Sequence, residues 1–169
     1  MELSEAIFAR ASVRAFADEP VSDEQVERLL RAAMAAPSAG NQQPWSWHLT
    51  RDPALRAALA AASPYAAPAA KAPLVIVPCM VPGRARHADY CPQDLSAAVE
   101  NLLLAAVDED LGAVWMGIAP MPGRMAAVSA ALSLPEGEEP FALVAVGVPA
   151  RDPSPTGAGR YDPARVTWH

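Results

Sequence analysis

Arginine and serine side chains alternate near the amino terminus, at Arg10, Ser12 and Arg14. In an extended segment alternate side chains point the same way, so two guanidiniums and a hydroxyl would share one face. Arginine offers planar, paired donors that suit a phosphate monoester. The spacing therefore indicates an anion clamp, although a solvated basic turn would show the same short pattern.

A loop of small and amide-bearing residues follows in Pro37-Ser-Ala-Gly-Asn-Gln-Gln-Pro-Trp. Small residues such as Ser38 and Ala39 let a backbone approach a flat ligand closely. Asn41 and Gln43 carry both donors and acceptors, which suit the mixed edge of a heterocycle. The other interpretation is a plain connection between a helix and a strand, because the same residues favour turns.

Two further segments have one structural and one ligand-binding interpretation each. In Gly112-Ala-Val-Trp-Met-Gly-Ile, a strand containing Gly117 would let backbone N–H and C=O groups reach a ligand ring. Trp115 and Met116 are equally typical of a protein core. Asn101 lies in an apolar helix, and a buried Asn needs partners, so it either binds a ligand or ties two helices together.

Several classes of function lose support because their signals are missing. The sequence has neither a dinucleotide-binding G-x-G-x-x-G after a strand nor a P-loop. Its histidines, His48, His87 and His169, show no local ligand spacing with cysteine or carboxylate, so we predict no metal. The formal net charge of −6 argues against nucleic acid as a partner. Residues 74–81, the longest apolar run, fall short of the roughly 20 residues that span a bilayer. Cys79 and Cys91 lack C-x-x-C spacing, which favours a reducing cytoplasm.

These residues need a scaffold, and the apolar periodicity predicts one domain over residues 1–169. Ser4 is expected to cap a short helix that turns Ile7 and Phe8 inward. Ser22, with Gln25 three residues later, is expected to open a second helix that Pro37 stops. The predicted strands are 45–49, 74–77, 114–118 and 141–148. The other predicted helices are 53–62, 92–110 (ended by Gly112) and 125–132.

The central helix and the tail both point to a partner subunit. Residues 102–107 are apolar on nearly every face of their helix, which a chain of 169 residues has trouble surrounding. Residues 150–169 contain prolines and glycines and no compact element, so they are expected to be disordered or laid across another surface. A subunit interface would account for both features.

Taken in order, these segments resemble the nitroreductase family over essentially the whole chain. That family's pattern looks like R-x-S-x-R, P-S-x-x-N-x-Q-P-W, D-x-x-A-A-x-x-N-x-L-L-A-A, G-x-x-W-x-G and a basic tail. The matching positions run from Arg10, through Pro37, Asp94 and Gly112, to the tail that holds Arg160. One departure is Ala11, where many relatives have a second basic residue.

The resemblance implies an α+β, nitroreductase-like fold in which helices flank a central antiparallel sheet. It also implies a homodimer in which residues 150–169 cross to the partner, with FMN between the subunits. By carry-over, the cofactor-binding residues are Arg10, Ala11, Ser12, Arg14, Pro37, Ser38, Ala39, Asn41, Gln43, Asn101, Trp115, Met116, Gly117 and Arg160.

The activity implied by this resemblance is that of an FMN-dependent oxidoreductase. NADH or NADPH would give hydride to flavin N5, and an electron-poor small molecule such as a nitroaromatic or a quinone would then occupy the same face. One shared face predicts ping-pong kinetics and no dedicated catalytic side chain. The alternatives are another flavin chemistry on the same fold (dehalogenation, flavin breakdown or azoline oxidation), a flavin-binding protein without turnover, and a helical interaction protein.

Overall fold

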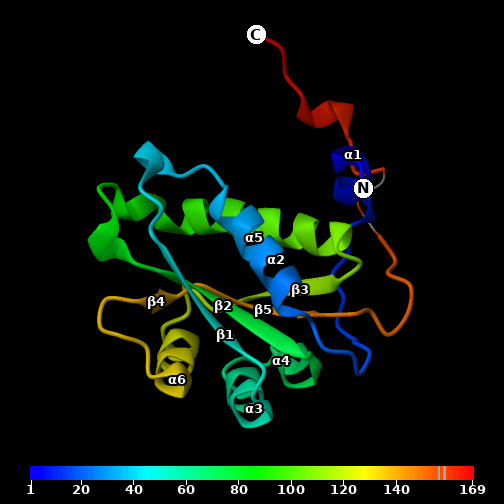
Figure 1. Cartoon of the computed structure of the whole chain (residues 1–169). Coiled ribbons are helices and arrows are strands. Elements are labelled where there is room, and N and C mark those ends of the chain that lie inside the picture. The colour runs from blue at the N-terminus through cyan, green and yellow to red at the C-terminus, as the bar shows by residue number, and fades with distance from the viewer. Residues whose placement is uncertain (156, 158) are drawn as a thin grey trace.

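The computed structural model describes residues 1–155, 157 and 159–169, and it places a five-stranded antiparallel sheet between two helical layers (Figure 1). The strands are β1 (Trp45–Thr50), β2 (Leu74–Met80), β3 (Gly112–Gly117), β4 (Glu139–Pro140) and β5 (Ala142–Gly147). Their order is β1-β2-β5-β3, and the short β4 pairs with β2. The predicted α+β class, with an antiparallel sheet flanked by helices, is confirmed.

Helices α2 (Asp23–Met34) and α5 (Cys91–Asp108) cover one face of the sheet. Helices α3 (Pro53–Ala61), α4 (Ala67–Lys71) and α6 (Pro122–Leu132) cover the other. Each strand contributes side chains to both layers in alternation, because successive side chains of a strand point to opposite faces of the sheet. In β2, Leu74 and Ile76 pack toward α5, whereas Val75 and Val77 pack toward α3 and α4.

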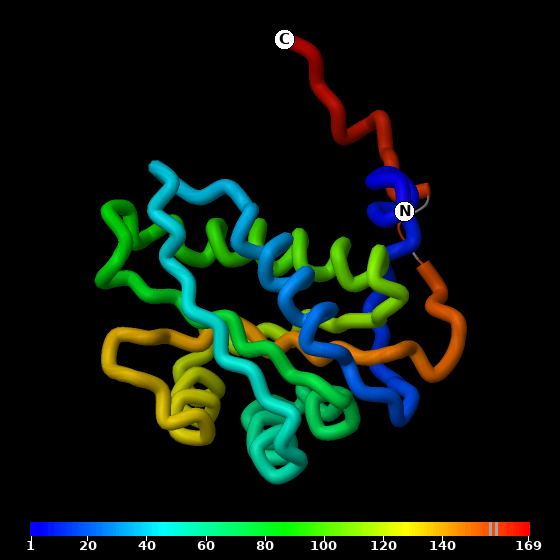
Figure 2. The backbone as a smooth tube through the Cα atoms, in the orientation of Figure 1, coloured from blue at the N-terminus to red at the C-terminus, as the bar shows by residue number. Residues whose placement is uncertain are grey.

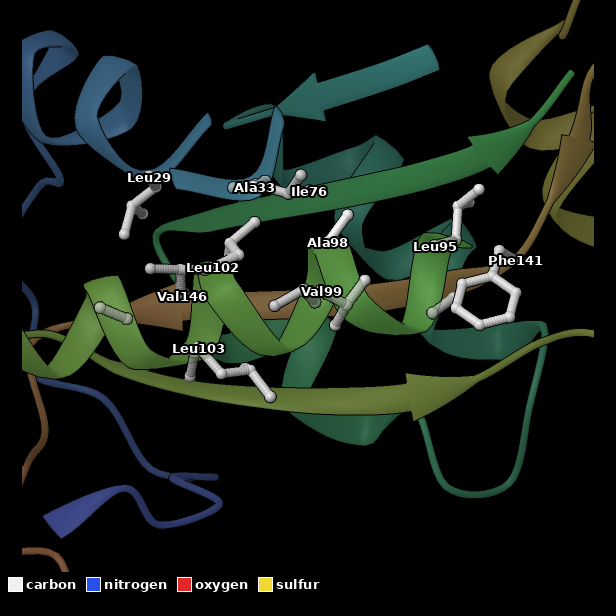
Figure 3. Packing of buried hydrophobic residues seen from close by; sticks show 14 of the residues in the cluster. Leu29, Ala33, Ile76, Leu95, Ala98, Val99, Leu102, Leu103, Phe141 and Val146 are labelled. Carbon is white, nitrogen blue, oxygen red and sulfur yellow. The ribbon is translucent and has the colours of Figure 1, made fainter. Parts of the chain in front are cut away.

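The predicted burial of the central helix is largely confirmed within one chain. Its side chains Leu95, Val99 and Leu102 are fully buried between the sheet and α2 (Figure 3). Leu104 and Val107, by contrast, are only half-buried. The surface that a partner could still cover is therefore one stripe of α5 and not the whole helix.

The second helix begins as its sequence predicts, while the first differs. Gln25 N–H donates to Ser22 Oγ at 3.1 Å, and Ser22 N–H donates to Gln25 Oε1 at 3.0 Å, forming the expected capping box. Helix α1 (Leu3–Ala9) starts one residue before Ser4, at an N-cap of Glu2. The prediction that Ile7 and Phe8 point inward is wrong for the single chain, because only Ala6 of this short helix is buried, while Ile7 and Phe8 are 47% and 57% exposed.

Gly112 has a different role from the predicted helix stop. Helix α5 already ends at Asp108, and Asp110 takes the left-handed conformation (φ 56°) that closes it. Gly112 instead opens β3, where an added Cβ would lie 2.6 Å from Val13 Cγ2. Helix α4 and strand β4 were not predicted, because each is too short to show a periodic pattern.

The carboxyl-terminal segment leaves the body of the protein beside α1 (Figure 1). Its described residues after Ala150 are almost all exposed, and they form only a short turn of 3-10 helix at Pro163–Arg165. No helix among the described residues combines the length and apolarity needed to cross a membrane.

Candidate functional site

The segment Arg10–Arg14 is extended and lies against β3, as its alternation requires. Ser12 forms a parallel bridge with Ala113, and Val13 N–H donates to the Ala113 carbonyl at 3.0 Å. Val13 is buried against Gly112. Its two neighbours in the segment, Ser12 and Arg14, therefore point to the opposite side and are exposed. The close approach at Gly112 is thus what turns the polar residues of this segment outward.

A cavity of about 550 Å³ opens beside this segment, between residues 11–15 and 151–154. Ser12 and Arg14 line it, and Arg14 Nη1 donates to the Ser12 carbonyl at 3.3 Å. Arg10 lies at the adjoining α5, where its Nε is 3.5 Å from Glu100 Oε1 and its side chain is 23% exposed. The volume lies within the roughly 300–1,000 Å³ of small-molecule sites, and the donors on its wall suit a phosphate.

The loop at 37–43 is held in an unusual backbone conformation. Three of its residues have a positive φ, namely Gly40 (55°), Asn41 (54°) and Gln43 (47°), whereas Gln42 between them is helical (φ −75°). Gln43 N–H donates to Ser38 Oγ at 3.0 Å, and Gln43 Nε2 donates to Asn41 Oδ1 at the same distance. Non-glycine residues adopt positive φ only where their surroundings impose it, and such sites gather at ligand-binding positions.

The anchor of this loop is Asp94, which was predicted only as a motif position. Its buried carboxylate accepts Ala39 N–H at 2.9 Å and Gln42 Nε2 at 2.7 Å. Gln42 in turn accepts His87 N–H at 2.9 Å and donates to the His87 carbonyl at 3.1 Å. The role of Gln42 was not predicted from the sequence. The only sequence signal for the Asp94–Gln42 contact is that Asp94 is an acidic residue on the buried side of an apolar helix.

In strand β3 the core interpretation holds for the side chains of Trp115 and Met116, and the ligand-binding interpretation of residues 115–117 stays a prediction. Met116 is buried, and the Trp115 ring lies 5.5 Å from that of Phe141, so these side chains belong to the core. The strand itself ends the sheet order, and nothing lies within 4 Å of a Cβ added at Gly117. A second cavity of about 330 Å³ is lined by Arg14, residues 114–117, Tyr65 and Arg124, so the fold brings the clamp and β3 together.

Asn101 makes a structural contact in this chain. Its Nδ2 donates to the Ala32 carbonyl at 3.1 Å and so ties α5 to α2. This contact supports the helix-tying alternative. The assignment of Asn101 to a ligand stays a prediction.

The fold does not bring the two halves of the predicted site together within one chain. The loop at 37–43 is anchored at Asp94, near the start of α5, whereas Ala11 and Val13 share a cavity with Val107 and Leu111, near its other end (Figure 2). Arg10 lies between these two places, at Glu100. Thirteen residues of α-helix separate Asp94 from Val107, which corresponds to about 20 Å. Arg160 is exposed in the tail that follows Ala150.

The structure is a three-layer α+β domain in which residues 10–14 lie beside the edge strand β3. The family model described as "Nitroreductase family" matches residues 7–82 and 65–148, and the chain belongs to that family. A protein of Archaeoglobus fulgidus described as an NADH dehydrogenase/NAD(P)H nitroreductase is 38% identical over 162 residues, which cover 95% of this chain and 93% of the relative.

Solved structures agree with the family and the fold. A Clostridium acetobutylicum protein described as an NADH oxidase superposes with a TM-score of 0.92 at 37% identity, covering 96% of this chain and 97% of that one. A Desulfovibrio desulfuricans protein described as a nitroreductase was solved in complex with FMN. It superposes with a TM-score of 0.85 at 34% identity, covering 97% and 94% of the two chains.

Proposed function

We propose that this nitroreductase-family protein is an FMN-dependent oxidoreductase that passes electrons from NADH or NADPH to small electron-poor acceptors such as nitroaromatics or quinones. The observation that carries the proposal is the cavity beside Ser12 and Arg14, in a chain that is 34% identical to a relative solved with FMN. Both the donors on the cavity wall and its volume fit a flavin mononucleotide.

The residues of one chain divide between the two ends of such a ligand. Arg10, Ser12 and Arg14, with the backbone at Ala11 and with Arg160 from a tail, would hold the phosphate and ribityl end. The ring would lie against the backbone of Trp115–Gly117 and against a loop of small and amide residues, namely Pro37, Ser38, Ala39, Asn41 and Gln43, with Asn101 behind it. When bound, FMN supplies the hydride-accepting ring atom, and the protein supplies position and charge.

The separation of the clamp from the loop supports a site shared between two chains. Val107, which lies beside residues 11–13, is about 20 Å along α5 from Asp94, and this favours a flavin that takes its clamp and its loop from different chains. Two copies related by a two-fold axis would place the loop of one against the clamp of the other. This arrangement gives the proposed homodimer two equivalent sites.

Exposed apolar side chains support the same assembly. Leu3 and Phe8 of α1 are 69% and 57% exposed, and Trp168 of the tail is 93% exposed. Such side chains seldom gather on the surface of a monomer. We place them in the subunit interface, with residues 150–169 crossing to the partner. We assign the protein to the reducing cytoplasm, because both of its cysteines are free.

The test is the colour and the reductive titration of purified protein. Flavin released by heat should chromatograph as FMN, and anaerobic NADH or NADPH should bleach the bound flavin without any added acceptor. Steady-state rates with a quinone should give the parallel double-reciprocal lines of a ping-pong mechanism. FAD in the extract would contradict the cofactor assignment, and a yellow protein that neither nicotinamide bleaches would contradict the activity.

A further inference from the structure

A second cluster of reactive side chains lies on the opposite side of the sheet from α5. One ligand atom each from His48, Cys79 and Glu138 lies within 4.8 Å of the other two. The three residues come from β1, from β2 and from the turn before β4. Local spacing predicts no such set, but strand pairing creates it, because Ser46 lies opposite Cys79 and Cys79 lies opposite Pro140.

The cluster is compact and mostly enclosed. His48 Nε2 lies 2.7 Å from Glu138 Oε2, and Ser46 Oγ donates to the same oxygen at 2.5 Å. Cys79 is fully buried in the core layer that α3, α4 and α6 cover, while the side chains of His48 and Glu138 are 28% and 14% exposed. Solvent therefore reaches the cluster from the histidine side only partly, and the thiol is its inner wall.

We propose that His48, Cys79 and Glu138 form a zinc site, separate from the flavin site, that fastens the turn before β4 to β1 and β2. An imidazole nitrogen, a thiolate sulfur and a carboxylate oxygen are the donors that Zn²⁺ takes in proteins. Ser46 or a water molecule would complete four-coordination. Binding exchanges the thiol proton, which goes to solvent, for the metal ion, and it transfers no electrons. Mg²⁺ and Ca²⁺, which prefer oxygen-only ligands, would compete poorly.

The experiment titrates Co²⁺ into untagged, flavin-loaded protein that has been freed of metal with a chelator. Difference spectra should show a thiolate-to-cobalt charge-transfer band that saturates at about one equivalent per chain, and Zn²⁺ should displace it. The melting temperature should rise with Zn²⁺, since an ion that binds only the native state stabilises it. Flavin content should not change, and this keeps the result distinct from the flavin assignment.

Two substitutions and a matched control identify the ligands. Cys79→Ser should abolish the charge-transfer band, and His48→Gln should weaken Co²⁺ binding at least ~10- to 100-fold, because it removes an imidazole ligand. Cys91→Ser removes the other buried thiol and should leave the band unchanged. His48→Gln alters a partly exposed side chain, so this variant should fold and still test the metal site if Cys79→Ser fails to fold. Absence of the band in the natural sequence, or unchanged affinity in His48→Gln, would overturn the proposal.

Discussion

At the scale of single residues, the site depends on a few charged contacts that fix otherwise unfavourable geometry. Asp94 is the clearest case, because one buried carboxylate accepts from both Ala39 and Gln42 and so holds the loop at 37–43. Arg10 has a comparable role at the clamp, where Glu100 receives its guanidinium on α5. Each contact makes a separate prediction.

Arg10→Ala should lower FMN affinity about 10- to 100-fold, because a charge-assisted contact contributes ~1.5–3 kcal/mol. Fluorescence titration of deflavinated protein measures the affinity, and circular dichroism checks the fold. The control is Arg31→Ala, which removes another arginine engaged in an ion pair, with Glu27 on α2. Equal affinity in both variants would mean that residues 10–14 form a solvated turn.

Asp94→Asn should loosen the loop, since the substituted amide keeps one acceptor oxygen and loses the charge shared by two donors. We expect a loss of ~1–3 kcal/mol in the free energy of unfolding, together with weaker FMN binding. Urea unfolding and flavin titration measure the two effects. Asp108→Asn on the same helix serves as the control, because Asp108 is exposed and pairs with the amino terminus. A loop anchored by other contacts would leave Asp94→Asn indistinguishable from that control.

At the scale of elements, the clamp is positioned by the close approach of residues 12–13 to β3. This approach requires a residue without a side chain at 112, since a Cβ there would meet Val13 at 2.6 Å. The glycine thus links a backbone contact to the outward direction of Ser12 and Arg14.

Gly112→Ala should therefore destabilise the protein by ~1–3 kcal/mol, the usual cost of overpacking, and should weaken FMN binding as the clamp moves. Gly123→Ala is the matched control, because nothing lies within 4 Å of an added Cβ at that helical position. That variant should be neutral, or more stable by up to ~1 kcal/mol. Thermal melts and flavin titration measure both, and an equally stable Gly112→Ala would show that the segment at 12–13 is not packed tightly on β3.

Most elements could be predicted from the sequence, because their apolar periodicity and caps are local signals. The capping box at Ser22 and the strand at Trp45–Thr50 are examples. The inward turn of Ile7 and Phe8 was wrong, because periodicity reports an apolar face and not which surface covers it. Gln42 and the His48–Cys79–Glu138 cluster were missed, since both depend on contacts between distant segments that only strand pairing and helix packing create.

At the scale of the whole molecule, we propose that two chains complete each other's flavin sites. The exposed face of α1 and the projecting tail are the surfaces that we propose a partner covers. We expect an obligate symmetric dimer that buries more than about 2,000 Å² in total.

Deleting the residues after Ala150 should weaken both dimer formation and FMN binding, because the tail is proposed to contact the partner subunit and the flavin phosphate. Light scattering and flavin absorbance of the truncated protein measure these losses. Deletion of His169 alone serves as the control, since it alters the end of the tail but keeps both Arg160 and Trp168. A stable, fully yellow monomer after the longer truncation would contradict the exchange of tails.

The most direct test of the shared site is the flavin content of a mixed dimer. One chain carries Arg10→Ala and Arg14→Ala, the other carries Asn41→Ala and Gln43→Ala, and two different affinity tags select the dimer that contains both. When clamp and loop come from different chains, this dimer has one intact and one doubly damaged site. It should then bind about half the FMN of the natural dimer, although each variant alone binds almost none. A mixed dimer as empty as either parent would contradict the shared site, because each flavin would then take its clamp and its loop from a single chain.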